Sequence, residues 1–133
     1  LGVAAATVLG HVFPIYLRFK GGKGVATGFG SMLALFPQVT IPAVAALIVW
    51  IITVKIWRMV SLASCLAAIT LPIAVAIGTL ASGGDGGFAR ALPFLALTGL
   101  LGTLVLLRHR SNIRRILDRT ESKIGTKAKP TEE

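Results

Sequence analysis

Charged side chains are scarce in this chain of 133 residues: only 14% are Asp, Glu, Lys or Arg, against about 25% in an average soluble domain. Acidic residues are the rarer sign, with five Asp and Glu against fourteen Lys and Arg. Apolar residues make up 54% of the sequence, and the mean hydropathy is +0.80. This composition excludes an ordinary soluble domain and predicts a membrane protein.

The sequence also lacks several residue groups that carry chemistry. It has no paired carboxylates, no serine triad, and no His and Cys residues at metal-ligand spacing. Cys65 is the single cysteine, so an intramolecular disulfide is excluded, and its place in an apolar run predicts a buried thiol. Asp85, alone among glycines, offers too few oxygen ligands for a hard cation, so its segment is expected to be a turn. No metal site is therefore expected.

Long stretches without ionisable residues predict membrane-spanning helices. A helix needs about 20 residues to cross the hydrocarbon core of a bilayer. The run of 31 residues from 24 to 54 is too long for one crossing, and Pro37 and Pro42 divide it. We therefore expect an all-α, polytopic bundle with about five spans. These are residues 1–17, 25–36, 40–54, 59–82 and 91–107.

Positive charge lies almost entirely on one side of this predicted bundle. With five crossings, the loop at 18–23, the link at 55–58 and the C-terminal tail share one face and hold thirteen of the fourteen Lys and Arg residues. The other face has only Arg90, so the positive-inside rule places the basic face in the cytoplasm. We expect a helical bundle over residues 1–107, and a basic cytoplasmic helix with a mobile tail over 108–133.

The segment FKGGKGVAT, residues 19–27, combines glycines and lysines on this basic face. The glycines allow backbone N–H groups to converge on an anion, and the start of the following helix adds its dipole. A Walker A motif is excluded, because Leu17 and Gly24 stand where it needs a glycine and a Ser or Thr. Two interpretations remain open, a phosphate site or a basic turn with a small-residue helix contact. The candidate phosphate ligands are Lys20, Gly21, Gly22, Lys23, Gly24 and Thr27.

Two further segments offer candidate site residues. His11, at the end of the first apolar run, is either a proton carrier or an interfacial hydrogen-bonding group. The tail RHRSNIRRILDRTESKIG has apolar residues at helical spacing among arginines, which is typical of a helix on an anionic leaflet. Alternatively, Asn112 and one of the arginines turn inward to the glycine loop, where the arginine fork suits phosphate. Nucleic acid is not an expected partner, because the net charge of +9 belongs to a membrane face and a tail near lipid.

The stretch GHVFPIYLRFKGGKGVAT, residues 10–27, resembles the second signature segment of the bacterial acyl-phosphate glycerol-3-phosphate acyltransferases, integral membrane enzymes of phospholipid synthesis. Ser111 stands where that family usually has an acidic residue, and a serine there could cap a helix start. The first family segment, a Ser, Gly and Asn-rich loop with an arginine, is absent from a chain that begins inside an apolar run with no signal-peptide pattern. The third segment is similar at His109, Arg110, Asn112, Ile113, Arg115, Thr120, Glu121, Lys123 and Ile124.

The resemblance implies a multi-pass enzyme of the bacterial inner membrane. It implies acyl transfer from acyl phosphate to the 1-hydroxyl of glycerol 3-phosphate, giving 1-acylglycerol 3-phosphate and phosphate. No cofactor is implied, because acyl phosphate is already activated, and the partners are the two substrates and membrane lipids. With the first segment missing, we expect this chain alone to be inactive. An anion transporter or channel subunit and a non-catalytic membrane scaffold are the alternatives.

The resemblance also implies roles for particular residues. The glycine loop, with Lys20 and Lys23, would hold a substrate phosphate, supported by Thr27. Asn112 and Arg115 would line or brace the same pocket. His11 is a tentative carrier for the proton of the glycerol hydroxyl, in competition with a substrate phosphate.

Overall fold

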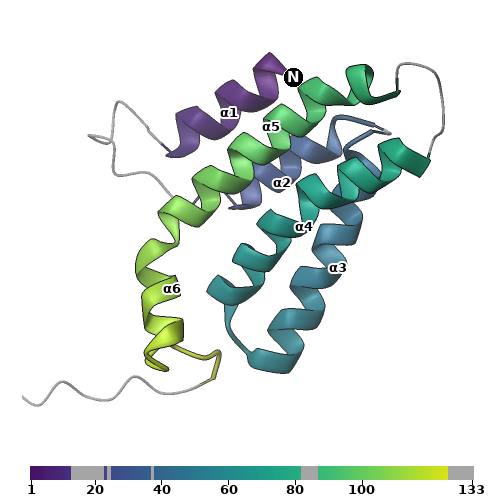
Figure 1. Ribbon diagram of the computed structural model, residues 1–133. Coiled ribbons are helices and arrows are strands. Elements are labelled where there is room, and N and C mark those ends of the chain that lie inside the picture. Colours follow the sequence, from purple (N-terminus) through teal and green to yellow (C-terminus); the bar gives the residue numbers. More distant parts are fainter. Residues whose placement is uncertain (13–22, 24, 37, 82–86, 126–133) are drawn as a thin grey trace, which may run out of the picture.

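The computed structural model describes residues 1–12, 23, 25–36, 38–81 and 87–125. Helices are the only regular secondary structure in these residues, which confirms the expected all-α class (Figure 1). Six helices follow one another in the described residues. They are α1 (Gly2–Val12), α2 (Val25–Leu33), α3 (Thr40–Trp57), α4 (Val60–Ala81), α5 (Gly87–Arg108) and α6 (Arg110–Leu117).

Three of the described helices are long and apolar enough to cross a membrane. They are α3, α4 and the part of α5 from Ala89 to Arg108, with 18, 22 and 20 residues. Large apolar side chains stay exposed on them, including Ile41 at 64% and Ile77 at 61%, as expected for surfaces that face lipid. The other two predicted spans are shorter: α1 has 11 residues and α2 has nine, about 14 Å of helix for α2. Within the described residues, three of the five expected crossings therefore have helices of membrane length.

The ends of several helices differ from the expected ones. Residues 34–36 form a turn after α2, which ends at Leu33 rather than residue 36. Helix α3 continues to Trp57, and Lys55 in its last turn suits the negative end of the helix dipole. Helix α5 begins at Gly87, so the last part of the expected glycine-rich turn is helical, while residues 82–86 lie outside the described ones.

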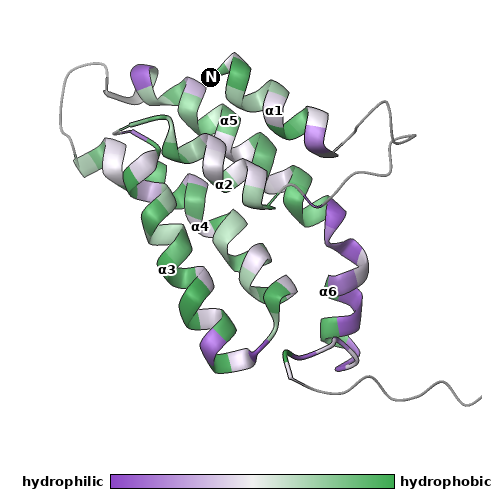
Figure 2. Cartoon of the chain, turned by 180° about the vertical axis from the view of Figure 1, so that it is seen from behind, coloured by the Kyte–Doolittle hydropathy of each residue, from purple (hydrophilic) through white to green (hydrophobic). Residues whose placement is uncertain are grey.

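The three membrane-length helices form a row in which α4 packs between α3 and α5 (Figure 1). A tight turn joins α3 to α4, where Arg58 has a left-handed backbone (φ 57°) and its N–H donates to the carbonyl of Val54 at 2.8 Å. Figure 2 shows apolar colouring along α3 and α4 and hydrophilic colouring on α6. The polar end of the row is therefore the end where the α3–α4 turn and α6 lie.

A proline and a glycine set the approach of α4 to α5. Pro72, inside α4, has no N–H to donate to the carbonyl of Ala68, four residues earlier. Gly102 of α5 lies against that carbonyl, because a Cβ added there would be 2.7 Å from the Ala68 oxygen. Only a residue without a side chain allows this close contact.

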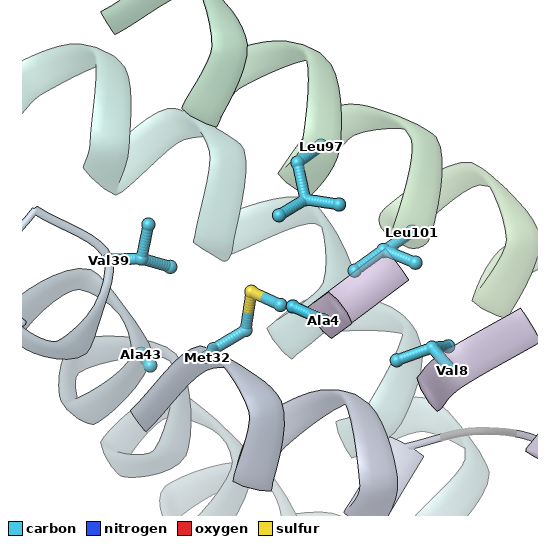
Figure 3. Packing of buried hydrophobic residues seen from close by; sticks show 7 residues of the cluster. All are labelled: Ala4, Val8, Met32, Val39, Ala43, Leu97 and Leu101. Carbon is cyan, nitrogen blue, oxygen red and sulfur yellow. The ribbon is translucent and has the colours of Figure 1, made fainter. Parts of the chain in front are cut away.

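The buried apolar core joins the two short helices to the longer ones (Figure 3). Met32 of α2 is 1% exposed and lies among side chains from three other helices. This packing fixes the last turn of α2 against α1, α3 and α5. The cluster consists of Ala4, Val8, Met32, Val39, Ala43, Leu97 and Leu101.

Candidate functional site

A hydrogen bond joins the glycine-rich segment to the C-terminal segment. The Nζ atom of Lys23, just before α2, donates to Oδ1 of Asn112 in α6 at 2.7 Å, across 89 positions of sequence. Asn112 is buried, at 6% exposure, whereas Lys23 is exposed. The structure thus brings together two of the predicted site residues, and leaves an ammonium group at the surface beside a buried amide.

Glu121 is the central acceptor of this cluster. Its Oε1 accepts hydrogen bonds from Nδ2 of Asn112 at 2.7 Å and from Oγ of Ser61 at 2.5 Å. Its Oε2 accepts from Nε of Arg115 at 2.8 Å, in an ion pair whose carboxylate side chain is 4% exposed. A buried carboxylate requires such partners, and here α4 and α6 supply them.

The same contacts determine the charge of Glu121. Burial raises the pKa of its carboxyl group, but the hydrogen bonds from Ser61, Asn112 and Arg115 favour the charged form and lower the pKa below its ordinary value. Glu121 is therefore ionised at neutral pH. Because Lys23 and Arg115 are both cationic, the cluster keeps a net charge of about +1, which suits an anionic ligand.

His109 is a buried imidazole at the junction of α5 and α6. It is 2% exposed, and its Nδ1 lies 2.8 Å from the carbonyl oxygen of Val105. A carbonyl only accepts, so Nδ1 carries the proton and Nε2 has the lone pair in the neutral ring. Burial lowers the pKa of His109, the bond to Val105 raises it, and Lys23 lowers it further, with a net decrease. The ring is neutral at pH 7.

The segment after α6 folds back onto the α3–α4 turn. Arg119 has a left-handed backbone (φ 58°) that reverses the chain after the helix. The N–H of Ile124 then donates to the carbonyl of Arg58 at 2.7 Å, and Gly125 has a φ of 83° beside the Arg58 guanidinium. Residues 126–133 of the predicted mobile tail lie outside the described ones. The segment of residues 118–125 therefore places Glu121 against the start of α4.

A cavity of about 820 Å³ runs from this polar cluster into the bundle. Ser61, His109 and Asn112 lie at its polar end. Along α4 its wall continues from Ser61 to Leu71, ten residues or about 15 Å of helix. The side chain of Trp50 lies on this wall, and its Nε1 donates to Oγ of Ser64 at 3.3 Å. Apolar walls come from residues such as Phe29, Met32, Ala43, Ala46, Leu47, Ala67, Ala68 and Gly102.

The other predicted site residues have different outcomes. His11 lies in the last turn of α1, is exposed and lines the same cavity. Thr27 lies in the first turn of α2 and is half-buried. Arg115 joins the cluster through Glu121. Four of the predicted phosphate ligands lie outside the described residues: Lys20, Gly21, Gly22 and Gly24.

Three polar residues of this cluster were not predicted as site residues. Glu121 and His109 belong to the matched tail, and the signal that could have identified them was an acidic residue and a histidine in a basic segment. Ser61 is one serine in an apolar run, which has no distinguishing pattern, because such serines commonly bond between helices. Its partner is a carboxylate 60 residues away.

Comparisons with known proteins agree on one family. A family model described as glycerol-3-phosphate acyltransferase matches residues 1–119. A glycerol-3-phosphate acyltransferase of Desulforamulus reducens is 42% identical over 127 residues, which cover 96% of this chain and 57% of that protein. One of Bordetella pertussis is 42% identical over 125 residues, covering 94% of this chain and 54% of that protein. The chain therefore spans about half the length of these relatives.

A solved structure has a similar fold. The crystal structure of PlsY (YgiH), described as an integral membrane glycerol 3-phosphate acyltransferase in its glycerol 3-phosphate form, superposes with a TM-score of 0.70 and 37% identity. The match covers 91% of this chain and 54% of the other. The likeness extends over nearly all of the present chain, so the described helices are arranged as in an integral membrane protein.

Proposed function

The chain belongs to the glycerol-3-phosphate acyltransferase family, and on this premise we propose that the protein transfers a fatty acyl group from acyl phosphate to the 1-hydroxyl of glycerol 3-phosphate. The products are 1-acylglycerol 3-phosphate and inorganic phosphate. The observation that carries the proposal is the bond between Lys23 and Asn112 at the polar end of an apolar cavity. A substrate with a phosphate head and a hydrocarbon tail needs both features next to each other.

The substrate phosphate binds at the cationic end of the cavity. Lys23 supplies a full positive charge at the surface, and Arg115 adds a second charge beside Glu121. The glycine loop of residues 20–24 and Thr27 supply N–H and hydroxyl donors around the same phosphate. A cation held at the reacting phosphate also stabilises the negative charge that builds up on it as it leaves.

The reaction is a direct transfer of the acyl group between the two substrates. The glycerol oxygen attacks the acyl carbon, the bond from that carbon to the phosphate oxygen breaks, and phosphate leaves with its electron pair. The hydroxyl proton goes to a base at the polar end. His11 at the cavity wall, the neutral ring of His109 and the departing phosphate are the candidates. Acyl phosphate is activated already, so orientation and charge supply the rate enhancement and no cofactor takes part.

The same arrangement supports an orientation in the membrane. The segment 118–125 meets the α3–α4 turn at one end of the bundle. This end also carries Lys23, Lys55, Arg58 and α6. We place this end in the cytoplasm of a bacterium, so that the apolar cavity extends from it towards the lipid. If α1 and α2 are counted with the three longer helices, the chain has up to five crossings. Residues 1–107 then form the membrane part and 108–133 the cytoplasmic part.

Glycerol 3-phosphate-dependent release of phosphate from acyl phosphate tests the proposal. The protein expressed from its own gene is assayed in membranes, and Lys23→Ala is expected to lower kcat/KM at least 100-fold, because it removes a positive charge from the substrate phosphate. Lys55→Ala is the matched control, since Lys55 is an exposed lysine on α3. It is expected to stay within about twofold of the unsubstituted protein. Equal activities of the two variants, or no release at all, would contradict the proposed function.

A further inference from the structure

Ser61 is a buried hydroxyl in the first turn of α4 whose bond partner lies in the C-terminal segment. We propose that Ser61 is a positioning residue for the anion site: it holds the Glu121 carboxylate so that Asn112 presents its oxygen to Lys23. The inference rests on the proposed function. It means that a residue of α4, in the membrane part of the chain, fixes the position of the polar cluster. Ser61 lies outside both of the segments that resemble family signatures.

The hydrogen bonds form a continuous path from Ser61 to Lys23. Oγ of Ser61 donates to Oε1 of Glu121 at 2.5 Å, Nδ2 of Asn112 donates to the same Oε1 at 2.7 Å, and Nζ of Lys23 donates to Oδ1 of Asn112 at 2.7 Å. Both ends of the Asn112 amide are thereby used. If the amide turned by 180°, its NH2 group would face the Lys23 ammonium, and two donors would repel one another.

Glu121 needs an external support because it lies in no helix. The segment 118–125 follows α6 as turns and irregular backbone. Arg115 reaches the other carboxylate oxygen, but its side chain is 49% exposed and therefore gives a weaker anchor. Ser61 is 6% exposed on a helix of 22 residues, so it ties the carboxylate to a rigid element.

A second serine on α4 provides a matched control. Ser64 is also buried, at 3% exposure, and lies one turn further along the helix. Its hydroxyl donates back to the carbonyl of Val60 at 2.9 Å and accepts from Trp50, which makes it a helix-to-helix contact within the membrane part. Alanine is a better helix former than serine, so neither substitution weakens the helix itself.

The test is a double-mutant cycle in the protein expressed from its own gene. We expect Ser61→Ala to lower kcat/KM for glycerol 3-phosphate about tenfold, since a hydrogen bond to a charged group is lost. Ser61→Thr keeps the hydroxyl and is expected to stay within about threefold, and Ser64→Ala within about twofold. In a Glu121→Gln background, Ser61→Ala should have less than about a twofold further effect, because the two residues act through one path.

A purely structural role for Ser61 predicts a different pattern. The effects of Ser61→Ala and Glu121→Gln would then multiply, and Ser64→Ala would lower activity as much as Ser61→Ala. Either result, or full activity of Ser61→Ala, would overturn the inference. Gly125→Ala is a second probe: it strains a residue at φ 83° at the other anchor of the segment, and is expected to lower kcat/KM in the same direction.

Binding of inorganic phosphate separates this inference from the proposed function. Phosphate is titrated into the detergent-solubilised protein and followed by calorimetry, with the same variants. We expect Ser61→Ala to weaken phosphate binding about tenfold and Ser64→Ala to leave it unchanged. If the unsubstituted protein binds phosphate in this pattern but transfers no acyl group, the proposed function fails and the positioning role stands. Equal phosphate binding by both variants overturns the positioning role alone.

Discussion

Replacing Glu121 with glutamine tests the centre of the polar cluster with the smallest change of shape. Three donors point at the carboxylate, from Ser61, Asn112 and Arg115. Glutamine has one oxygen and one NH2 group, so at least one of these donors would face another donor. Glu121→Gln therefore removes the charge and leaves at least one of the three donors without an acceptor.

The expected cost follows from the contacts. A hydrogen bond to a charged group stabilises by about 1.5–3 kcal/mol and a neutral one by about 0.5–1.5 kcal/mol, so the buried bonds from Ser61 and Asn112 lose about 1 kcal/mol each. The bond to Arg115 contributes less, because its side chain is 49% exposed and water can replace the carboxylate. We expect Glu121→Gln to lower the free energy of unfolding by about 2–3 kcal/mol.

Reversible unfolding in detergent measures this change. Asp118→Asn is the matched control: it makes the same carboxylate-to-amide replacement at an exposed position at the end of α6. It is expected to change the free energy of unfolding by less than about 0.5 kcal/mol. If Glu121→Gln destabilised the protein no more than Asp118→Asn, the buried carboxylate would not be a stabilising centre, and the reasoning would be refuted.

The pH dependence of stability gives an independent check. The pKa of Glu121 is lower in the folded protein than its ordinary value, so its ionised form stabilises the fold. This contribution is complete above the ordinary pKa of a glutamate, about 4.3, and is lost as the pH falls through the folded value. The stability difference between the unsubstituted protein and Glu121→Gln should therefore shrink below about pH 4 and be constant from pH 5 to 7. A difference that grew on acidification would have the wrong sign.

Two further pairs of variants test the packing of the bundle and the use of the cavity. Gly102→Ala should unfold about 2–3 kcal/mol more easily than Gly99→Ala in the same detergent assay, because its Cβ would lie 2.7 Å from the backbone oxygen of Ala68 while Gly99 has open space. Equal stabilities would show that the helices separate without cost. Ala46 lies at the cavity wall, so Ala46→Leu should reduce the space for the acyl chain. We expect kcat/KM for long-chain acyl phosphates to fall, relative to that for short-chain ones, by about fourfold for each methylene displaced. Ala45 lies on the exposed side of the helix, and Ala45→Leu should leave this ratio unchanged. An unchanged chain-length profile would place the acyl chain elsewhere.

Much of the fold could be predicted from local pattern. Residues 59–82 were expected to form one helix, and α4 runs from Val60 to Ala81, because an apolar run bounded by charge and glycine has few other solutions in lipid. The division of the run 24–54 was also correct: α3 starts at Thr40, and Pro42 lies in its first turn, where no N–H is required. The predicted end of α2 at residue 36 was wrong, because the helix ends at Leu33 and residues 34–36 form a turn. No local pattern distinguishes such a frayed end.

The site could be predicted only in part. A dense motif identified Lys23, and a match in the tail identified Asn112 and Arg115, each within its own segment of the sequence. Their roles in binding substrate stay a prediction. Glu121 lies in the same matched tail but was given no role there. Ser61 carried no comparable signal, because its partner is 60 residues away.

Composition and the spacing of charges were enough to predict a helical membrane protein with its positive charge gathered at one end, because polar groups are costly in lipid. The sequence also pointed to an anion site in the glycine-rich segment. The tertiary structure was needed to show which side chains lie beside Lys23. A buried carboxylate must find its donors wherever the fold brings them, and packing brought Ser61, Asn112 and Arg115 to Glu121, with Lys23 one hydrogen bond away.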